Sequence, residues 1–303
     1  MRGAAFPSDP PYPPAEQRRP PLLPLPGAAA WGDDAYGLWV DFDIAGVVLR
    51  FRWIEPGEFW MESPEGEAER EDSEGPRHGV RLTAVFWLAD TACTQALWGA
   101  VMGGQNPSQF QDDPANPVEQ VSWDDVSAFL QRVAARLPAV EPALPSEAEW
   151  EYACRAGTET PFHFGATIHP AQANYDGNYP YVGGEKGEYR AKTVPVKSFA
   201  PNPWGLYEMH GNVWGWCADG LRLYDAEAHE NPRGPEGDDA PRVVRGGSWG
   251  DEAGRLRSAY RTRGPRGYRN GFQGFRFSLR STSQDQEAGA ERLSQRGGGT
   301  RDA

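Results

Sequence analysis

Cysteine is scarce in this chain of 303 residues, which contains only Cys93, Cys154 and Cys217. The three are widely spaced, form no Cys-x-x-Cys pair and lie among apolar or aromatic neighbours. A disulfide scaffold needs an even set of cysteines at regular spacing. The shortage therefore argues against a secreted disulfide-rich protein and favours a reduced, cytoplasmic one in which each thiol is a small buried apolar group.

Cationic side chains and long apolar runs are also in short supply. Lys and Arg number 30 against 43 Asp and Glu, which gives a formal net charge of −13. Binding along a phosphate backbone needs clustered cations, so we expect no nucleic-acid partner. No segment reaches the roughly 18 apolar residues that cross a bilayer, and the first residues hold no apolar signal region, so we expect no membrane association.

Glycine and proline are abundant, with 36 and 28 residues, and they predict a loop-rich fold. Residues 1–30 form a proline-rich tail, interpreted as disordered chain or as a linker or docking strand, and residues 281–303 form a polar, disordered tail. The folded domain is predicted to span residues 31–280. Twelve tryptophans, too many for a disordered chain, indicate that most of this region folds.

Local patterns predict a few regular elements within that domain. Residues 38–42 and 47–54 form a predicted strand pair, and so do 57–61 and 80–83. Helices are predicted after three caps, Thr94, Ser122 and Ser146, of which the last opens a Ser-Glu-Ala-Glu capping box and is followed by a stop at Gly157. Pro138 ends the helix from Ser122. The region after Gly157 shows no amphipathic helix, so the fold class is α+β with low regular secondary-structure content.

Six sequence blocks in chain order carry a resemblance to one family. They lie at residues 57–63, 116–123, 144–153, 202–214, 244–249 and 274–276. Together they resemble the formylglycine-generating enzyme and sulfatase-modifying factor family. The resemblance implies a C-type-lectin-like domain of the formylglycine-generating-enzyme type.

The family's oxidase chemistry requires residues that this chain lacks. The resemblance implies a copper ion held by two thiolates just after the Gly-Gly-Ser block, because soft thiolates select Cu(I). Residues 249–260 contain no cysteine, and Asp251 and Glu252 are hard oxygen ligands. We therefore expect neither copper nor formylglycine formation. The five histidines also lack the spacing of the family's iron enzymes, and His78 and His210 are expected to form structural hydrogen bonds.

The resemblance also implies structural calcium. The matched positions of one site are Glu208, Gly211, Val213 and Gly215, where Gly215 replaces a family glutamate. Calcium takes about six to eight oxygen ligands, so losing a carboxylate weakens this site, and Glu208 compensates only in part. A second site is conceivable at Asn174-Tyr175. Structural calcium is therefore a hypothesis rather than an expectation.

Residues 250–272 combine a regular frame with residues of no evident structural type. This layout resembles the changeable region of variable proteins from diversity-generating retroelements, which use the same lectin-like fold. The alternative is an ordinary family member whose loop has drifted and whose arginines pair with internal acids. In either case the segment predicts a binding surface, because exposed aromatic area binds at low entropy cost. The predicted ligand-binding residues are Trp249, Gly250, Asp251, Glu252, Gly254, Tyr260, Thr262, Gly264, Gly267, Tyr268, Asn270, Gly271 and Phe272.

These observations favour a non-catalytic binding module. Its partner would be a protein, a peptide or a small ligand, and an anionic one is plausible because six arginines cluster in residues 255–269. Most of these arginines are expected to pair within the domain. One alternative is a divergent oxidase or modifying enzyme with a non-standard residue set. Another is an adaptor in a bacterial defence or signalling system, attached through the proline-rich tail.

Overall fold

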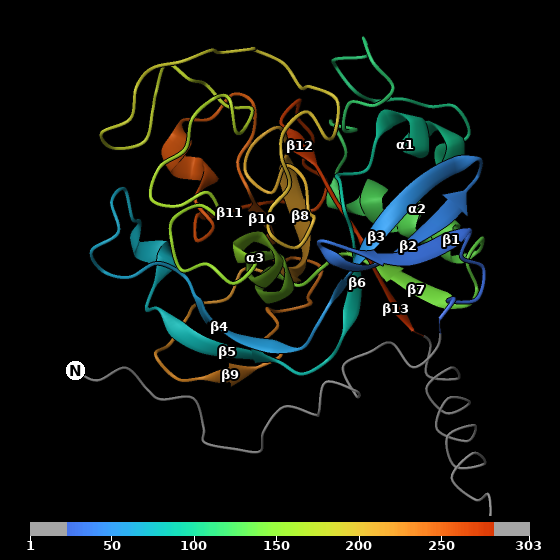
Figure 1. Cartoon of the computed structure of the whole chain (residues 1–303), viewed down its shortest axis with the longest axis horizontal. Helices are drawn as coiled ribbons and strands as arrows, with labels where there is room; N and C mark the ends of the chain where they lie inside the picture. The colour runs from blue at the N-terminus through green and yellow to red at the C-terminus, as the bar shows by residue number, and fades with distance from the viewer. Residues whose placement is uncertain (1–22, 282–303) are drawn as a thin grey trace, which may run out of the picture.

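The computed structural model of the protein describes residues 23–281, which form three β-sheets and three α-helices (Figure 1). Among these described residues only 14% are helical, 3-10 turns included, and 27% are in strands or bridges. An average globular domain is about one-third helix, so the predicted low content of regular structure is confirmed. The two predicted tails lie mainly outside the described residues. Leu25, upstream of the predicted boundary at residue 31, is buried in the core.

The largest sheet has six strands in the order β1-β2-β3-β6-β13-β7. The predicted pair at its start is confirmed, with Ile44 opposite Val47 across a turn in which Ala45 and Gly46 have positive φ. The last described strand inserts between β6 and β7, so the C-terminal end of the domain lies inside the sheet. The strands are β1 (Ala30–Asp34), β2 (Gly37–Ile44), β3 (Val47–Ile54), β6 (Phe86–Ala89), β7 (Val140–Ala143) and β13 (Ser278–Ser281).

Two smaller sheets complete the strand structure. A three-stranded sheet has the order β4-β5-β9, and its first two strands confirm the second predicted pair. A four-stranded sheet has the order β11-β10-β8-β12, with β12 parallel to β8. The strands are β4 (Gly57–Met61), β5 (His78–Leu82), β9 (His229–Glu230), β8 (Trp214–Gly220), β10 (Arg242–Arg245), β11 (Arg261–Gly264) and β12 (Gln273–Gly274).

All three predicted helices form and begin after Thr94, Ser122 and Ser146, but the second ends at Ala134 and not, as predicted, at Pro138. They are α1 (Gln95–Met102), α2 (Trp123–Ala134) and α3 (Glu147–Arg155), and short 3-10 turns lie at η2 (Asp72–Glu74) and η3 (Ala253–Leu256). The hydroxyls of Thr94, Ser122 and Ser146 each accept a hydrogen bond from a first-turn N–H. Helix α3 ends in left-handed Ala156, one residue before the predicted Gly157, which is also left-handed.

Aromatic packing joins the helices to the six-stranded sheet. The rings of Trp98 in α1 and Phe129 in α2 stack with centroids 5.3 Å apart. Phe129 in turn meets Phe275 edge-on at 5.3 Å and Phe277 at 5.8 Å. These contacts place the 274–276 block in the core, because residues on both sides of Arg276 are anchored in the same cluster.

Buried arginines hold the irregular half of the domain. Arg257 is fully buried and pairs with Glu74 at 2.5 Å and Glu67 at 2.9 Å, both from the acidic loop between β4 and β5. It also donates to the carbonyl of Glu69 at 2.6 Å. Bidentate pairing of this kind compensates the desolvation of the guanidinium. The expectation that arginines pair internally is confirmed here.

Two further arginines attach the four-stranded sheet to α3. Arg245 in β10 is fully buried, pairs with Glu151 and donates to the carbonyl of Ala259 at 2.8 Å. Arg261 in β11 pairs with Glu147 at 2.6 Å. Glu62 stands beside this network without a hydrogen bond to either carboxyl oxygen, and burial together with the charge of Glu151 raises its pKa well above the usual range.

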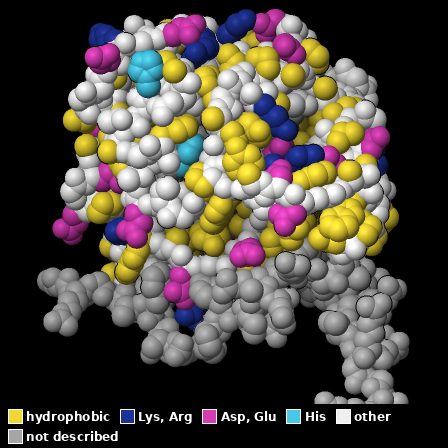
Figure 2. Space-filling model, viewed as in Figure 1, with side chains coloured by type: hydrophobic (Ala, Val, Ile, Leu, Met, Phe, Trp, Pro, Cys, Tyr) yellow, Lys and Arg dark blue, Asp and Glu magenta, His cyan; other side chains and the backbone are white. Residues whose placement is uncertain are grey.

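The surface is acidic, with apolar side chains between the charged groups. Figure 2 shows exposed apolar side chains across the middle of the face drawn there. Large exposed apolar residues include Tyr179, Val182, Leu223, Tyr268 and Phe272. Within residues 23–281 no helix has the length and apolar character to cross a membrane.

Replacing Arg257 by Met should destabilise the fold strongly. The change leaves Glu67 and Glu74 buried without their cation, so we expect the free energy of unfolding to fall by about 3–5 kcal/mol. The measurement is urea unfolding followed by tryptophan fluorescence. Arg269→Gln is the matched control, because Arg269 forms an exposed pair with Asp125 and should cost less than about 1 kcal/mol. Equal losses in the two variants would contradict the role assigned to Arg257.

Candidate ligand-binding site

A cavity of about 410 Å³ lies against the four-stranded sheet. Every strand of this sheet contributes to its wall, and two loops close around it. Val244 in β10 and Thr262 in β11 are register partners, so they share one face of the sheet. The lining residues are Trp214, Val244, Gly250, Asp251, Arg255, Tyr260, Thr262, Arg263, Tyr268, Asn270, Phe272 and Gln273. This size is typical of a small-molecule site.

Seven of the predicted ligand-binding residues meet in this cavity. They come from three places in the sequence, namely the turn after the Gly-Gly-Ser block, strand β11 with the residue before it, and the loop that leads to β12. These residues are Gly250, Asp251, Tyr260, Thr262, Tyr268, Asn270 and Phe272.

The other predicted positions lie outside the cavity wall. Trp249 supports it from behind, because its ring packs 4.7 Å from that of Phe272 and its indole N–H donates to the Gly271 carbonyl at 2.9 Å. Glu252 is exposed and pairs with Arg255 at 3.2 Å. Gly267 is exposed in a turn. Gly254, Gly264 and Gly271 lie close to the side chains of Glu69, Trp216 and Gln109, respectively.

The cavity wall includes five residues that the sequence did not single out as ligand-binding: Trp214, Val244, Arg255, Arg263 and Gln273. Trp214 belongs to a family block, so the sequence indicated a structural role for it. Gln273 enters because β12 runs parallel to β8 with Gln273 beside Trp214. The arginine cluster of residues 255–269 was the available signal for Arg255 and Arg263.

Aromatic rings form much of the wall. The rings of Trp214 and Tyr260 lie 5.9 Å apart, and Tyr268 and Phe272 are 48% and 36% exposed. Gly250 allows the Phe272 ring to approach, because a Cβ at this position would lie 2.6 Å from the ring. The wall therefore offers flat apolar area that is partly open to solvent.

The carboxylate of Asp251 already has hydrogen-bond partners within the protein. It accepts hydrogen bonds from the hydroxyl of Ser248 and from the backbone N–H of Ser248 at 3.0 Å. Arg255 lies 3.6 Å away, and burial raises the pKa of Asp251 above its usual value. Asp251 therefore stabilises the turn after the Gly-Gly-Ser block.

The three thiols lie elsewhere. Cys93, Cys154 and Cys217 are all buried, none lines the cavity, and burial raises the pKa of each. The sulfur of Cys154 lies 3.7 Å from the Nε2 of His210 and from the hydroxyl of Ser258. Buried thiols with raised pKa values are poor nucleophiles and poor metal ligands. The prediction of small buried cysteines is confirmed.

The two histidines in family-like blocks have structural partners. The Nδ1 of His210 lies 2.6 Å from the carbonyl of Leu256, and that of His78 lies 3.0 Å from the carbonyl of Pro76. Burial lowers the pKa of His210 to about 4, so this ring is neutral at physiological pH. Both predicted structural hydrogen bonds are confirmed.

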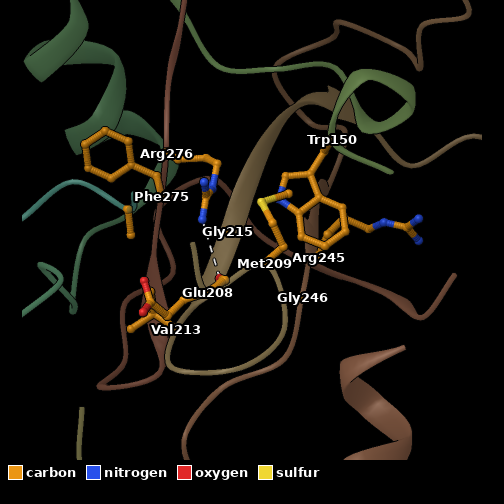
Figure 3. A pocket seen from close by; sticks show the side chains of 10 residues that line it. Trp150, Glu208, Met209, Val213, Gly215, Arg245, Gly246, Phe275 and Arg276 are labelled. Atoms are coloured by element: carbon orange, nitrogen blue, oxygen red, sulfur yellow. Dashed lines mark hydrogen bonds between the residues drawn. The ribbon is translucent and has the colours of Figure 1, made fainter. Parts of the chain in front are cut away.

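The positions matched to the first calcium site offer few free side-chain oxygens. Glu208 accepts hydrogen bonds from the backbone N–H groups of Lys197 at 3.1 Å and Phe199 at 3.4 Å. The guanidinium of Arg276 donates to the Glu208 carbonyl at 3.4 Å, as Figure 3 shows, and places a cation beside it. Gly215 supplies no side chain, and the cavity at this point is only about 10 Å³, room for roughly one water. Gly211 and Val213 add only backbone oxygens.

The second calcium position is different. Asn174 is fully buried, and its side-chain oxygen has no hydrogen-bond partner, whereas its amide nitrogen donates to Lys192 and Asn212. An unpartnered buried oxygen suits a cation or a water. Among residues 23–281 no three His, Cys, Asp or Glu side chains gather as metal ligands. Calcium at Asn174-Tyr175 stays a prediction.

Comparison with known proteins identifies the family. A family model described as "Sulfatase-modifying factor enzyme 1-like domain" matches residues 48–280. The chain belongs to this family. The formylglycine-generating enzyme of Streptomyces coelicolor is 32% identical over 249 residues, which cover 64% of this chain and 76% of that protein. The Thermomonospora curvata enzyme is 37% identical over 180 residues, covering 55% of this chain and 54% of that one.

Other relatives carry different names. A Bos taurus protein named "Inactive C-alpha-formylglycine-generating enzyme 2" is 35% identical over 177 residues, covering 57% of this chain and 50% of its own. Treponema denticola variable protein 1 has a similar structure, with a TM-score of 0.68 and 24% identity over 80% of this chain and 99% of that one. PvdO from Pseudomonas aeruginosa gives a TM-score of 0.63 at 24% identity, covering 83% and 98%. The predicted fold is thereby confirmed.

Glu208 should make stability fall as pH rises. Its pKa in the folded protein is about 7, above its ordinary value of 4.5, because burial disfavours the charged carboxylate. The folded state therefore holds this proton more tightly, and the resulting stability is lost as pH rises from 4.5 towards 7. We expect Glu208→Gln to become more stable relative to wild type by about 2 kcal/mol between pH 5 and pH 8. Urea unfolding at several pH values measures this.

The exposed Glu188→Gln is the control, since Glu188 is 64% exposed and forms only a surface pair with Arg190. The control should show no such pH-dependent gain. A flat difference between Glu208→Gln and wild type would contradict the assignment.

Calcium should act through Asn174 and not through Glu208. We expect calcium at about 1 mM to shift the melting temperature equally in wild type and Glu208→Gln, and any shift to disappear in Asn174→Ala. Differential scanning fluorimetry with and without EGTA measures it. A calcium shift that Glu208→Gln removes would overturn this expectation.

Proposed function

We propose that this protein is a non-catalytic ligand-binding module, with the 410 Å³ cavity as its binding site. The observation that carries the proposal is the convergence of Gly250, Asp251 and five more predicted residues on one cavity with no thiol in its wall. Copper oxidation in this family's manner needs two thiolates at the Gly-Gly-Ser turn. Asp251 and Glu252 stand there instead.

Rigid support beneath the cavity favours binding. Arg257, Ser258, Ala259 and the 274–276 block are buried, while Thr262, Tyr268 and Phe272 between them reach the cavity. Aromatic side chains on a fixed backbone lose little conformational entropy on binding. Substitutions at the cavity positions can therefore change the ligand with little effect on the core.

The names of related proteins are compatible with this proposal. One relative is called inactive, and one protein of similar structure is called variable. Each name describes the protein that carries it and not this chain. For this chain they support a scaffold that recognises a protein, peptide or small ligand. A divergent oxidase with another residue set is the alternative, and an oxygen assay separates the two.

A fragment screen tests the binding function. We expect saturation-transfer NMR to find small aromatic ligands for the wild-type protein and Tyr268→Ala/Phe272→Ala to weaken them by about tenfold or more. Tyr179→Ala is the matched control, because Tyr179 is 60% exposed and lies outside the cavity wall. Ligands that bind all three proteins equally would refute the cavity as the site.

The oxygen assay uses copper and a cysteine-containing peptide. We expect oxygen consumption no higher than with copper and peptide alone, while the Streptomyces coelicolor relative serves as the family comparison. Turnover by this protein above that background would refute the non-catalytic assignment.

A further inference from the structure

We infer that the cavity takes an anionic ligand with a flat apolar ring system. This inference depends on the proposed function, because it names the chemistry of the molecule bound there. Three features carry it: an arginine without a partner, a buried amide donor without an acceptor, and a wall of aromatic rings.

Arg263 is the cation without a partner. Within the described residues of the 255–269 cluster, every other arginine has a carboxylate partner, whereas Arg263 has no hydrogen bond or ion pair. It lies in β11, an outer strand of the four-stranded sheet, and it is an exposed residue that lines the cavity. A guanidinium with free N–H groups recognises carboxylate, sulfonate or phosphate oxygens in a planar, paired geometry.

Gln273 supplies the second donor. The residue is 4% exposed, lines the cavity, and its side-chain nitrogen is buried with no acceptor among the described residues. Pairing of β12 with β8 holds the backbone of Gln273 beside Trp214. Buried donors are rarely left unpaired in folded proteins. An acceptor atom on a bound ligand would satisfy the side-chain N–H donor of Gln273.

Two acceptors in the cavity already have partners within the protein. Asp251 accepts from Ser248 and faces Arg255, and the Tyr268 hydroxyl lies 3.3 Å from the donating amide nitrogen of Asn270. Arg263 and the Gln273 amide nitrogen therefore remain as donors that neither of these acceptors takes. The net charge of −13 does not cancel this local preference, because salt screens distant charges over about 8 Å at physiological ionic strength.

The aromatic side chains of the cavity wall indicate the apolar part of the ligand. Trp214, Tyr268 and Phe272 offer faces and edges to the cavity, and such rings pack well against another planar ring. A volume of about 410 Å³ accepts one or two fused or linked rings with a charged substituent. The chemical class is thus an aromatic carboxylate, sulfonate or phosphate.

A pair of fluorescent probes tests this inference. Anilinonaphthalene sulfonate carries the ring system and an anion, and N-phenylnaphthylamine carries the rings alone. We expect the wild-type protein to bind the anionic probe about tenfold more tightly than the neutral one. Arg263→Gln and Gln273→Glu should each abolish that preference by lowering the affinity for the anionic probe about tenfold. Fluorescence titration at fixed salt gives both constants.

Arg269→Gln is the matched control, since it removes another arginine of the 255–269 cluster that lies outside the cavity and pairs with Asp125. It should keep the preference for the anionic probe. Equal affinity of the two probes for wild type, or a preference that survives Arg263→Gln, would overturn the inference. The proposed function would still stand if Tyr268→Ala/Phe272→Ala weakened both probes, and it would fail together with the inference if that variant weakened neither.

The source of the anion is resolved by competition. Phenylacetate represents a small molecule, and a peptide ending in phenylalanine, with its terminus free or amidated, represents a chain end. Displacement of the anionic probe by phenylacetate or by the free-acid peptide, but not by the amidated one, supports the inference and names the source. Displacement by the amidated peptide as strongly as by the free acid would contradict the need for an anion.

Discussion

The buried pairing of arginines with glutamates is the interaction on which the irregular half of this domain depends. Arg257 reaches the acidic loop between β4 and β5, while Arg245 and Arg261 reach α3. These guanidiniums also donate to backbone carbonyls, so they complete the hydrogen bonding of segments that belong to no sheet or helix. A loop-rich region has few ladder hydrogen bonds of its own, and buried arginines supply what it lacks.

The same segment of chain both builds the frame and forms the cavity. Along β11, Arg261 points into the ion-pair network, whereas Thr262 lines the cavity. Thr262 and its neighbour Arg263 both line the cavity at an outer edge of the sheet, so one short strand serves both purposes. Its anchoring side chains are separate from those that meet a ligand, which is the physical condition for changing the site without unfolding the protein.

The turn after the Gly-Gly-Ser block is stabilised by oxygen acceptors. Asp251 accepts from the N–H and hydroxyl of Ser248, and the backbone N–H of Asp176 donates to the Asp251 carbonyl at 2.9 Å. Oxygen acceptors thereby stabilise a turn at which the family oxidases place thiolates. Asp251 and Glu252 are hard oxygen ligands, so this turn lacks the soft ligands that Cu(I) requires.

By itself, the sequence determined what depends on neighbours along the chain or on the bare presence of a residue. The helix caps at Ser122 and Ser146, the hairpin at Ala45-Gly46, the order of the family blocks and the lack of paired thiols are all of this kind, since capping and turn geometry involve residues a few positions apart. Only the tertiary structure decided which arginine of the cluster is left unpaired and which residues face one cavity. Arg257 and Arg261 pair with carboxylates far away in the sequence, whereas Arg263 has no carboxylate partner. Gln273 reaches the cavity through the register of β12 against β8. Such pairings join distant segments, so no local pattern encodes them, and the glycines at 254, 264 and 271 proved to be close-approach positions for the same reason.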